Sequence, residues 1–418
     1  MFLSTRTILL ICQVWLLCCA LLAGNAVKAQ STNAAFLGVV TDPGGEPMPG
    51  ATVQVQNEAT GFRTATATQA DGRYQLRQLP LGGPYVVTVS MIGYAAQQRK
   101  GLFLNQGDQI TLKFALSEAT TELTAVEVKS DRIIDQVQNF GAATSVTANQ
   151  IKNLPLENRN FQNLVALSPL QGNGSLGGAR SGATNITIDG SNARSPLWAG
   201  ATGVTGAMPY AISQEAIREF EVSTNEYDVT QGRQAGGAVN AVTKSGTNQF
   251  SGSAFVYHYN DQLQSQYDIR GNRRTADFSR YQWGFSLGGP IIKDKLHFFT
   301  AFDRQDESRP AYITDIQSEA DEARLGVRLD TLSKAIDVAR RLYGVGPGPQ
   351  VGQFANKTTA NTLFLRLDWT LNERHKLTFR NNLTSWNSPI NSGDNSDIVL
   401  RETYNSQKAR SYTGLVSL

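Results

Sequence analysis

From residue 249 onward, apolar and polar residues alternate along several short runs, which is the periodicity of a β-strand. In one run, Tyr281, Trp283, Phe285 and Leu287 alternate with Gln282, Gly284, Ser286 and Gly288. Aromatic and aliphatic residues occupy the apolar face of the other runs: Phe255, Tyr257, Tyr259, Leu296, Phe298, Phe302, Leu363, Leu365, Leu367, Trp369, Leu377, Phe379 and Leu383. The opposite face includes Arg366, Asp368 and Arg380, so one face suits lipid and the other a water-filled lumen.

The spacing of these runs separates a membrane barrel from a soluble sandwich. Strands are expected at residues 252–260, 279–290, 295–303, 361–371, 374–386 and 409–418, with links of about 18, 4, 57, 2 and 22 residues. Long and short links alternate strictly, as they do in outer-membrane barrels. This alternation is not expected in a soluble sandwich. Residues 249–418 are therefore predicted to be a partial transmembrane antiparallel β-barrel of about six strands. A helix is expected inside the longest link, at residues 320–343.

The first thirty residues have the pattern of an export signal. Arg6 precedes an apolar run at residues 8–23, and small residues at positions 26 and 29 follow it. We predict a cleaved signal peptide at residues 1–29; the alternative is an uncleaved anchor, because the run is nearly long enough to span a bilayer. All three cysteines, Cys12, Cys18 and Cys19, lie in this segment, so the exported chain contains none.

Composition narrows the class of protein further. Charged residues make up 17% of the chain, against about 25% in an average soluble domain. The 38 basic and 35 acidic residues leave no excess of positive charge to bind a phosphate backbone, so no nucleic acid partner is expected. Beyond the first thirty residues no other run is apolar enough for a spanning helix, and an exported membrane chain must then cross the bilayer with strands.

Residues 30–118 have the pattern of a small β-sandwich. Short runs of alternating residues are separated by turn signals, which include Asp42-Pro43-Gly44-Gly45 and Asp71-Gly72. Asp71-Gly72 predicts a hairpin rather than part of a calcium loop. The segment resembles the carboxypeptidase regulatory-like domain. Enzymatic activity is not expected, because none of the three histidines is followed three residues later by a glutamate, as a zinc carboxypeptidase site requires. We predict no catalytic residue, no metal site and no cofactor.

Residues 119–248 mix α and β patterns with long glycine-rich loops. An amphipathic segment is expected at residues 158–167, and strands at residues 186–188 and 220–223. Gly172, Gly174 and Gly177 match the dinucleotide fingerprint by spacing, but no strand precedes them and no helix follows, so a nucleotide site is not expected. The whole mature chain is thus predicted to be mainly β: a sandwich, an α+β unit and barrel strands.

Four runs carry a resemblance to a known family. They are residues 185–190 (NITIDG), 217–222 (IREFEV), 236–248 (GGAVNAVTKSGTN) and 287–299 (LGGPIIKDKLHFF). The chain resembles the Oar-like TonB-dependent outer-membrane receptors. The resemblance implies location in the outer membrane of a Gram-negative bacterium, contact with outer-membrane lipid, and an unknown extracellular ligand. It also implies that residues 119–248 are a plug, which TonB and its inner-membrane energising complex release for transport.

The resemblance also suggests a segment that pairs with TonB as an added strand. Its candidate residues alternate and are flanked by polar residues: Leu123, Thr124, Ala125, Val126, Glu127 and Val128. The alternative is an ordinary first strand of the plug, or a linker. Candidate ligand contacts lie in the loops of the plug: Arg180, Asp189, Arg194, Trp198 and Tyr210. Trp198 and Tyr210 suit stacking on a sugar or peptide, or alternatively packing within the protein.

Receptors of this family close with about 22 strands, so the six strands predicted here suggest an N-terminal fragment of a longer protein. The alternative function is that of a surface adhesin or a structural outer-membrane protein without transport.

The carboxylates are not expected to be catalytic. Asp303, Asp306 and Glu307 are expected to be solvated charges at the rim of the barrel.

Overall fold

The computed structural model gives the positions of most residues after the predicted signal peptide. The described residues are 34–118, 126–128, 143–147, 150–151, 159, 168, 171–172, 175–176, 184–192, 212–223, 237–263, 265, 267, 278–313, 315–348, 350–372, 375–389, 400 and 406–417. The predicted signal peptide and the predicted amphipathic segment at residues 158–167 fall outside them, apart from Arg159. No helix among these residues is long and apolar enough to cross a membrane.

The N-terminal part is a sandwich of two sheets, as the alternation predicts. Its strands are β1 (Ala34–Thr41), β2 (Thr52–Asn57), β3 (Arg63–Ala67), β4 (Arg73–Leu79), β5 (Gly82–Ser90), β6 (Gln97–Leu104), β7 (Gln109–Ala115) and β8 (Val126–Val128). One sheet has the order β4-β1-β7 and the other β3-β2-β5-β6-β8. Inward-facing residues such as Phe36, Val53, Val87 and Phe114 are buried between the sheets and form one apolar core.

One turn of the sandwich differs from the prediction. Gly72 has the positive φ of 72° that the Asp71-Gly72 pair suggests. The turn, however, joins β3 to β4, which lie in opposite sheets, so it is not a hairpin. An Asp-Gly pair specifies the local bend, whereas pairing of the flanking strands depends on which sheet buries their apolar faces.

A five-stranded middle sheet follows in the chain. Its order is β13-β12-β15-β14-β9, built from β9 (Ala143–Thr147), β12 (Asn185–Ile188), β13 (Ser191–Asn192), β14 (Ile217–Ser223) and β15 (Ala238–Thr243). The short strands β10 (Gln171–Gly172) and β11 (Ser175–Leu176) pair separately, and the 3-10 turn η1 (Gln214–Ala216) leads into β14. Every residue of the central strand β15 is buried. The expected strands at residues 186–188 and 220–223 therefore both belong to this sheet.

The last part of the chain is a six-stranded antiparallel sheet, which we call the wall sheet. Its strands pair in chain order: β16 (Ser251–Asn260), β17 (Ser279–Ile292), β18 (Leu296–Ile313), β19 (Gly352–Thr370), β20 (Lys376–Pro389) and β21 (Ser406–Ser417). All six predicted strands are present, and the described residues form an open sheet. The chain is mainly β, as predicted.

The longest link of the wall sheet is shorter than predicted. β18 runs on to Ile313 and β19 already begins at Gly352, because the two strands stay paired well beyond their apolar parts. The expected single helix is two helices, α4 (Glu319–Leu325) and α5 (Leu329–Tyr343). Gly326 ends α4 in the left-handed conformation, with φ 65°, and the Ser318 side chain caps its first turn.

The two faces of the wall sheet differ as the alternation predicts in four of the five strands whose faces were predicted. On the outer face, Tyr281, Leu365 and Trp369 are 39–46% exposed, whereas the inner-face residues Arg280, Gln282 and Phe364 are buried. Strand β16 is the exception. Phe255 pairs with Gly284 and Tyr257 with Gln282, which puts the aromatic residues of β16 on the inner face and Val256 on the outer face.

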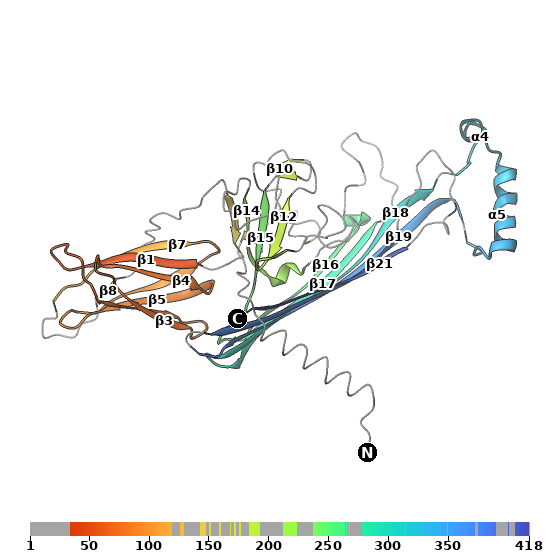
Figure 1. Ribbon diagram of the computed structural model, residues 1–418. Coiled ribbons are helices and arrows are strands. Elements are labelled where there is room, and N and C mark those ends of the chain that lie inside the picture. Colours follow the sequence, from red (N-terminus) through yellow and green to blue (C-terminus); the bar gives the residue numbers. More distant parts are fainter. Residues whose placement is uncertain are drawn as a thin grey trace, which may run out of the picture.

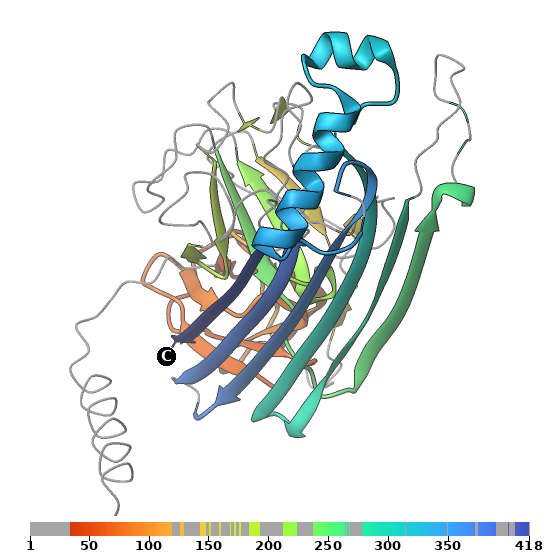
Figure 2. The same cartoon turned by 90° about the vertical axis from the view of Figure 1, so that its right-hand side faces the viewer.

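The middle sheet lies between the sandwich and the wall sheet. Figure 1 shows the sandwich at one end of the molecule, the wall strands extending away from it, and α4 and α5 at the far end. In the view turned by 90°, the middle strands lie on one side of the wall sheet (Figure 2). The inner face of the wall sheet is therefore the face that meets the middle sheet.

Candidate functional site

The contact between the middle sheet and the wall sheet begins at a tight turn. Asp189 and Gly190 join β12 to β13, and both have positive φ, 45° and 77°. Two such residues define the two-residue hairpin turn that an Asp-Gly sequence favours. The Asp189 amide donates a hydrogen bond to the carbonyl of Ala241 (2.8 Å). Thr243 fixes the carboxylate, because its amide donates to Oδ1 (2.8 Å) and its hydroxyl to Oδ2 (2.6 Å).

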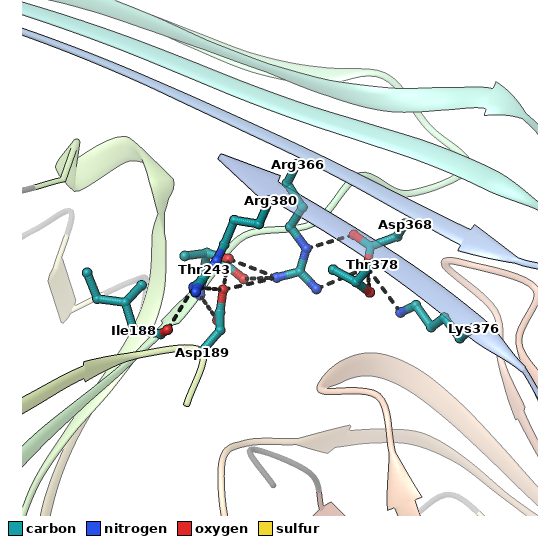
Figure 3. A network of polar contacts seen from close by, with 8 residues as sticks. All are labelled: Ile188, Asp189, Thr243, Arg366, Asp368, Lys376, Thr378 and Arg380. Atoms are coloured by element: carbon teal, nitrogen blue, oxygen red, sulfur yellow. Dashed lines mark hydrogen bonds and ion pairs between the residues drawn. The ribbon is translucent and has the colours of Figure 1, made fainter. Parts of the chain in front are cut away.

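Two arginines of the wall sheet meet this turn (Figure 3). Arg380 of β20 donates from Nη1 to Asp189 Oδ2 (2.6 Å) and to the carbonyl of Ile188 (2.8 Å). Arg366 of β19 donates from Nη1 to the hydroxyl (2.8 Å) and carbonyl (3.2 Å) of Thr243, and lies 3.7 Å from Asp189 Oδ2. The middle sheet and the wall sheet are thus joined by charge-assisted hydrogen bonds.

A second carboxylate positions Arg366. Asp368, two residues further along β19, accepts from Arg366 Nε (2.7 Å) and Nη2 (3.1 Å), so the pair is bidentate. Thr378 also donates to Asp368 (2.9 Å), and Lys376 lies 3.4 Å from it. We call these seven residues the anchor cluster: Asp189, Thr243, Arg366, Asp368, Lys376, Thr378 and Arg380.

The anchor cluster is largely shielded from water. The side chains of Arg380 and Asp368 are 4% and 5% exposed, and those of Asp189 and Arg366 are 13% and 14% exposed. Two carboxylates face three cationic groups within it. Ion pairs in such surroundings are strongly coupled, and removing one partner leaves an uncompensated charge, at a cost of about 3–5 kcal/mol.

Arg159 makes a second polar contact, to the first wall strand. Its guanidinium carbon lies 3.7 Å from the centroid of the Phe255 ring and 5.2 Å from that of Tyr257, a cation–π arrangement. Arg159 Nη2 also donates to Glu215 Oε1 (2.6 Å), while the Ser253 hydroxyl of β16 donates to Glu215 Oε2 (2.8 Å). Burial favours the neutral form of Glu215, but Lys244, Ser253 and Arg159 outweigh it and lower the pKa of Glu215.

Apolar side chains fill the space between these polar contacts. Phe299 and Ala301 of β18 and Phe364 of β19 belong to the same buried cluster as Ala216 and Phe220 of the middle part. The rings of Phe299 and Phe364 lie 6.3 Å apart. The inner face of the wall sheet is therefore covered by protein here, whereas the sequence suggested a water-filled lumen.

The arrangement supports attachment rather than chemistry. Among the described residues, no group of three His, Cys, Asp or Glu side chains could hold a metal ion. The charged groups of the anchor cluster pair with one another, and Arg366 and Arg380 reach from the wall sheet to Asp189 of the middle sheet. This contact can hold the middle sheet against the wall sheet. A displacement of the middle sheet would break the polar contacts together.

The predicted site residues are only partly described. Val126, Glu127 and Val128 form β8, which pairs in parallel with β6 of the sandwich, whereas Leu123, Thr124 and Ala125 lie outside the described residues. β8 is therefore an edge strand of the sandwich, a third possibility beside the linker and the first plug strand. Four predicted ligand contacts also lie outside the described residues: Arg180, Arg194, Trp198 and Tyr210. Asp189 belongs to the anchor cluster, and its contact with a ligand stays a prediction.

The carboxylates expected at the rim are not free in solvent. Asp303 and Glu307 are 1% and 7% exposed on the inner face of β18, and Glu307 pairs with Arg280 (2.7 Å) and Arg309 (2.6 Å). Asp306 pairs with Arg304 (2.8 Å). The prediction was wrong for Asp303 and Glu307, because β18 continues as a paired strand and buries its inner face here, whereas the Asp306 side chain on the outer face is 38% exposed.

Sequence analysis did not identify most of the site. The alternation put Arg366 and Arg380 on the inner face, but gave no sign of their partner. Arg380 and Asp189 are 191 positions apart in sequence. One signal could have indicated an ionic contact with an enclosed domain. It is the presence of an arginine at an inward position on each of two adjacent strands, Arg366 and Arg380.

Comparison with known families agrees with the two end domains. Residues 35–117 match the carboxypeptidase regulatory-like domain, and residues 242–417 match an outer membrane beta barrel domain. The chain is 28% identical over 305 residues to the TonB-dependent transporter Oar of Myxococcus xanthus, which covers 68% of this chain and 27% of Oar. It is 29% identical over 206 residues to the probable TonB-dependent siderophore receptor PirA of Acinetobacter baumannii, covering 44% of this chain and 26% of PirA.

Solved structures give the same class of neighbour. The outer membrane transporter YddB from Escherichia coli aligns with a TM-score of 0.40 at 15% identity, covering 59% of this chain and 33% of YddB. The ferric enterobactin receptor PfeA of Pseudomonas aeruginosa aligns with a TM-score of 0.38 at 15% identity over the same shares.

The fold and the family matches define an outer-membrane protein of a Gram-negative bacterium, with a sandwich, a middle domain and antiparallel wall strands. More specifically, the chain is similar to the TonB-dependent transporter Oar, and it spans about a quarter of that relative's length. These relatives are named as a transporter and a probable receptor, which agrees with the prediction that the chain is not an enzyme.

Proposed function

We propose that the chain is the gated part of a TonB-dependent outer-membrane transporter, in which residues 119–248 act as the plug. The wall sheet supplies part of the barrel, and the middle sheet closes it. TonB, energised across the inner membrane, releases the plug so that an extracellular ligand passes. The named activities of the relatives, transport and siderophore reception, support this class of function.

The observation that carries the proposal is the anchor cluster. A gate needs a closed state that is held firmly and can be released as a unit. Asp189 of the middle domain is held by Arg380 and Thr243, and Arg366 extends the network to Asp368. These contacts are few, buried and mutually dependent, so breaking one weakens the others.

The proposed TonB contact is the segment Leu123–Val128. β8 is the last strand of its sheet, and within the described part of the chain no strand pairs with its outer edge. An exposed strand edge presents main-chain donors and acceptors, which is what strand addition uses. This supports an extended TonB segment as the partner.

A surface adhesin or structural protein without transport is the competing function. Such a protein has no need of a buried ionic contact between an enclosed domain and the wall. It also has no need to bind TonB, so TonB binding separates the two functions.

The test is binding of the purified C-terminal domain of TonB to the full protein, with Val126→Pro as the disrupting variant. Proline removes a main-chain N–H from the segment, so binding should be lost. Glu127→Ala is the matched control, because it truncates a side chain and keeps the main chain, and it should bind as the wild type does. If the wild-type protein does not bind TonB, the proposed function is wrong.

A further inference from the structure

Arg218 joins the middle sheet to the sandwich. It lies on β14, and its Nη2 donates a hydrogen bond to the carbonyl of Leu104 at the end of β6 (3.1 Å). Gly82 pairs with Leu104 on the neighbouring strand, and a Cβ at Gly82 would lie 2.8 Å from Arg218 Nη1. The absence of a side chain at Gly82 therefore leaves the space that the guanidinium fills.

Glu219, the next residue of β14, makes a second contact with the sandwich. Its Oε1 accepts a hydrogen bond from the amide of Gln106 (2.9 Å), and the residue is only 3% exposed. Leu104 ends β6 and Gln106 lies two residues further on, so two adjacent residues of the middle sheet bind the end of β6 and the segment that follows it. A buried, doubly bonded contact of this kind holds two domains in a fixed relation.

The other end of β6 carries the proposed TonB segment. β8 pairs in parallel with the start of β6: Val126 with Gln97, Glu127 with Gln98 and Val128 with Arg99. The carbonyl that Arg218 binds lies five residues further along β6, about 17 Å at the rise of a strand. One strand therefore links the TonB segment to the middle sheet.

From this we infer that TonB adds its strand to the outer edge of β8 while β8 stays paired with β6. The pull then acts on the sandwich, and β6 delivers it to β14 through Arg218 and Glu219. The sandwich is thus the part of the protein on which TonB pulls to release the plug. This inference rests on the proposed function, and it adds the part that TonB moves first.

The test is a disulfide between β8 and β6, made as Gln98→Cys with Glu127→Cys. The sequence has no cysteine after Cys19, so the new pair forms without competition in the mature chain. Neighbouring strands lie about 4.8 Å apart, within the range that a disulfide spans. The same protein after reduction is the matched control, and the probe is the C-terminal domain of TonB.

If β8 remains paired with β6, the affinity of the oxidised protein for TonB should lie within about twofold of that of the reduced protein. A fall in this affinity of more than about tenfold on oxidation overturns the inference. Gln97→Cys with Val126→Cys is a second pair in the same register. Failure of both pairs to cross-link also overturns it, because the pairing would then be absent. No binding by the wild-type protein is a separate result, which contradicts the proposed function itself.

A second measurement tests the route from β6 to β14. Arg218→Ala should leave TonB binding unchanged but speed amide hydrogen exchange at residues 104–108 and 217–223, because the two segments lose their contact. Arg73→Ala is the control, since Arg73 is a largely exposed arginine of the same sandwich. Unchanged exchange in Arg218→Ala would show that the sandwich does not hold β14.

Discussion

At the scale of single residues, Asp189 has the most demanding environment. Its positive φ comes from the hairpin turn, and its carboxylate receives hydrogen bonds from Thr243 and Arg380. Because Arg380 is 4% exposed, its charge depends on this carboxylate for compensation. Neutralising Asp189 therefore affects the two sheets together and not the turn alone.

We predict that Asp189→Asn weakens the closed state by about 3 kcal/mol, because it leaves Arg380 buried and unpaired. Cells that express the variant should become more sensitive to vancomycin, a large hydrophilic antibiotic that a closed outer membrane excludes. Sensitivity is measured as the minimal inhibitory concentration.

Asp306→Asn is the control for this prediction. Asp306 also pairs with an arginine of the wall sheet, but both side chains are more than a third exposed, where such pairs contribute little. Equal sensitivity of the two variants would show that the anchor cluster does not hold the gate closed.

At the scale of elements, β16 shows how register decides the role of a strand. Its alternation alone suggested that Phe255, Tyr257 and Tyr259 face lipid. Pairing with β17 instead sets Phe255 opposite Gly284, and a Cβ at Gly284 would lie 2.8 Å from the Phe255 ring. The ring therefore lies against the glycine, and the Arg159 guanidinium lies over the same ring, 3.7 Å from its centroid. An aromatic strand thus serves as a contact for the enclosed domain.

We predict that Phe255→Ala loosens the contact of β16 with the middle domain, because it removes the cation–π partner of Arg159 and the cover of Gly284. The unfolding temperature should fall, and because Phe255 is only half-buried the loss should be smaller than the about 3 kcal/mol of a fully buried phenylalanine. Val256→Ala, one position away on the outer face, should change the unfolding temperature in detergent much less. An equal effect of the two changes would contradict the register.

At the scale of the whole molecule, two domain contacts fix the sandwich. Arg218 and Glu219 tie it to the middle sheet, and the Asn248 amide donates to the carbonyl of Ala59 (2.7 Å). Asn248 also accepts from the amide of Asp294 (2.9 Å), in the tight turn between β17 and β18. The sandwich is therefore attached both to the middle domain and to the wall.

The contact at Glu219 should depend on pH. Burial raises the pKa of Glu219, and Arg218 and the Gln106 amide only partly oppose it. A raised pKa means that the folded state favours the protonated form, so this contribution to stability is present below the ordinary pKa of glutamate. It is lost as the pH rises through the folded-state pKa.

We therefore predict that Glu219→Gln raises the unfolding temperature at pH 7, because glutamine can still accept from Gln106 and carries no charge. The difference from the wild type should shrink toward zero at acidic pH, where Glu219 is neutral in both states. Glu219→Ala should instead lose about 1–3 kcal/mol, because the Gln106 amide is left without its acceptor. A difference between glutamine and wild type that does not vary with pH would contradict the prediction.

The sequence by itself determined the local features of this protein. The alternation of residues specified the strands and most of their faces, the lengths of the links specified an antiparallel wall, and Asp-Gly pairs specified tight turns. These follow from the periodicity and backbone preferences of neighbouring residues, which act over a few positions. The motifs at residues 185–190 and 236–248 marked strands that the structure sets side by side as β12 and β15.

Only the tertiary structure decided which charges meet and what covers the inner face. Arg380 finds Asp189 across 191 positions, β16 turns its aromatic side inward, and β8 joins the sandwich as an edge strand. Each outcome depends on pairing and packing between segments that are distant in the sequence. An inward-facing arginine looks the same in sequence whether water or a carboxylate lies opposite it, because the partner is chosen by the fold.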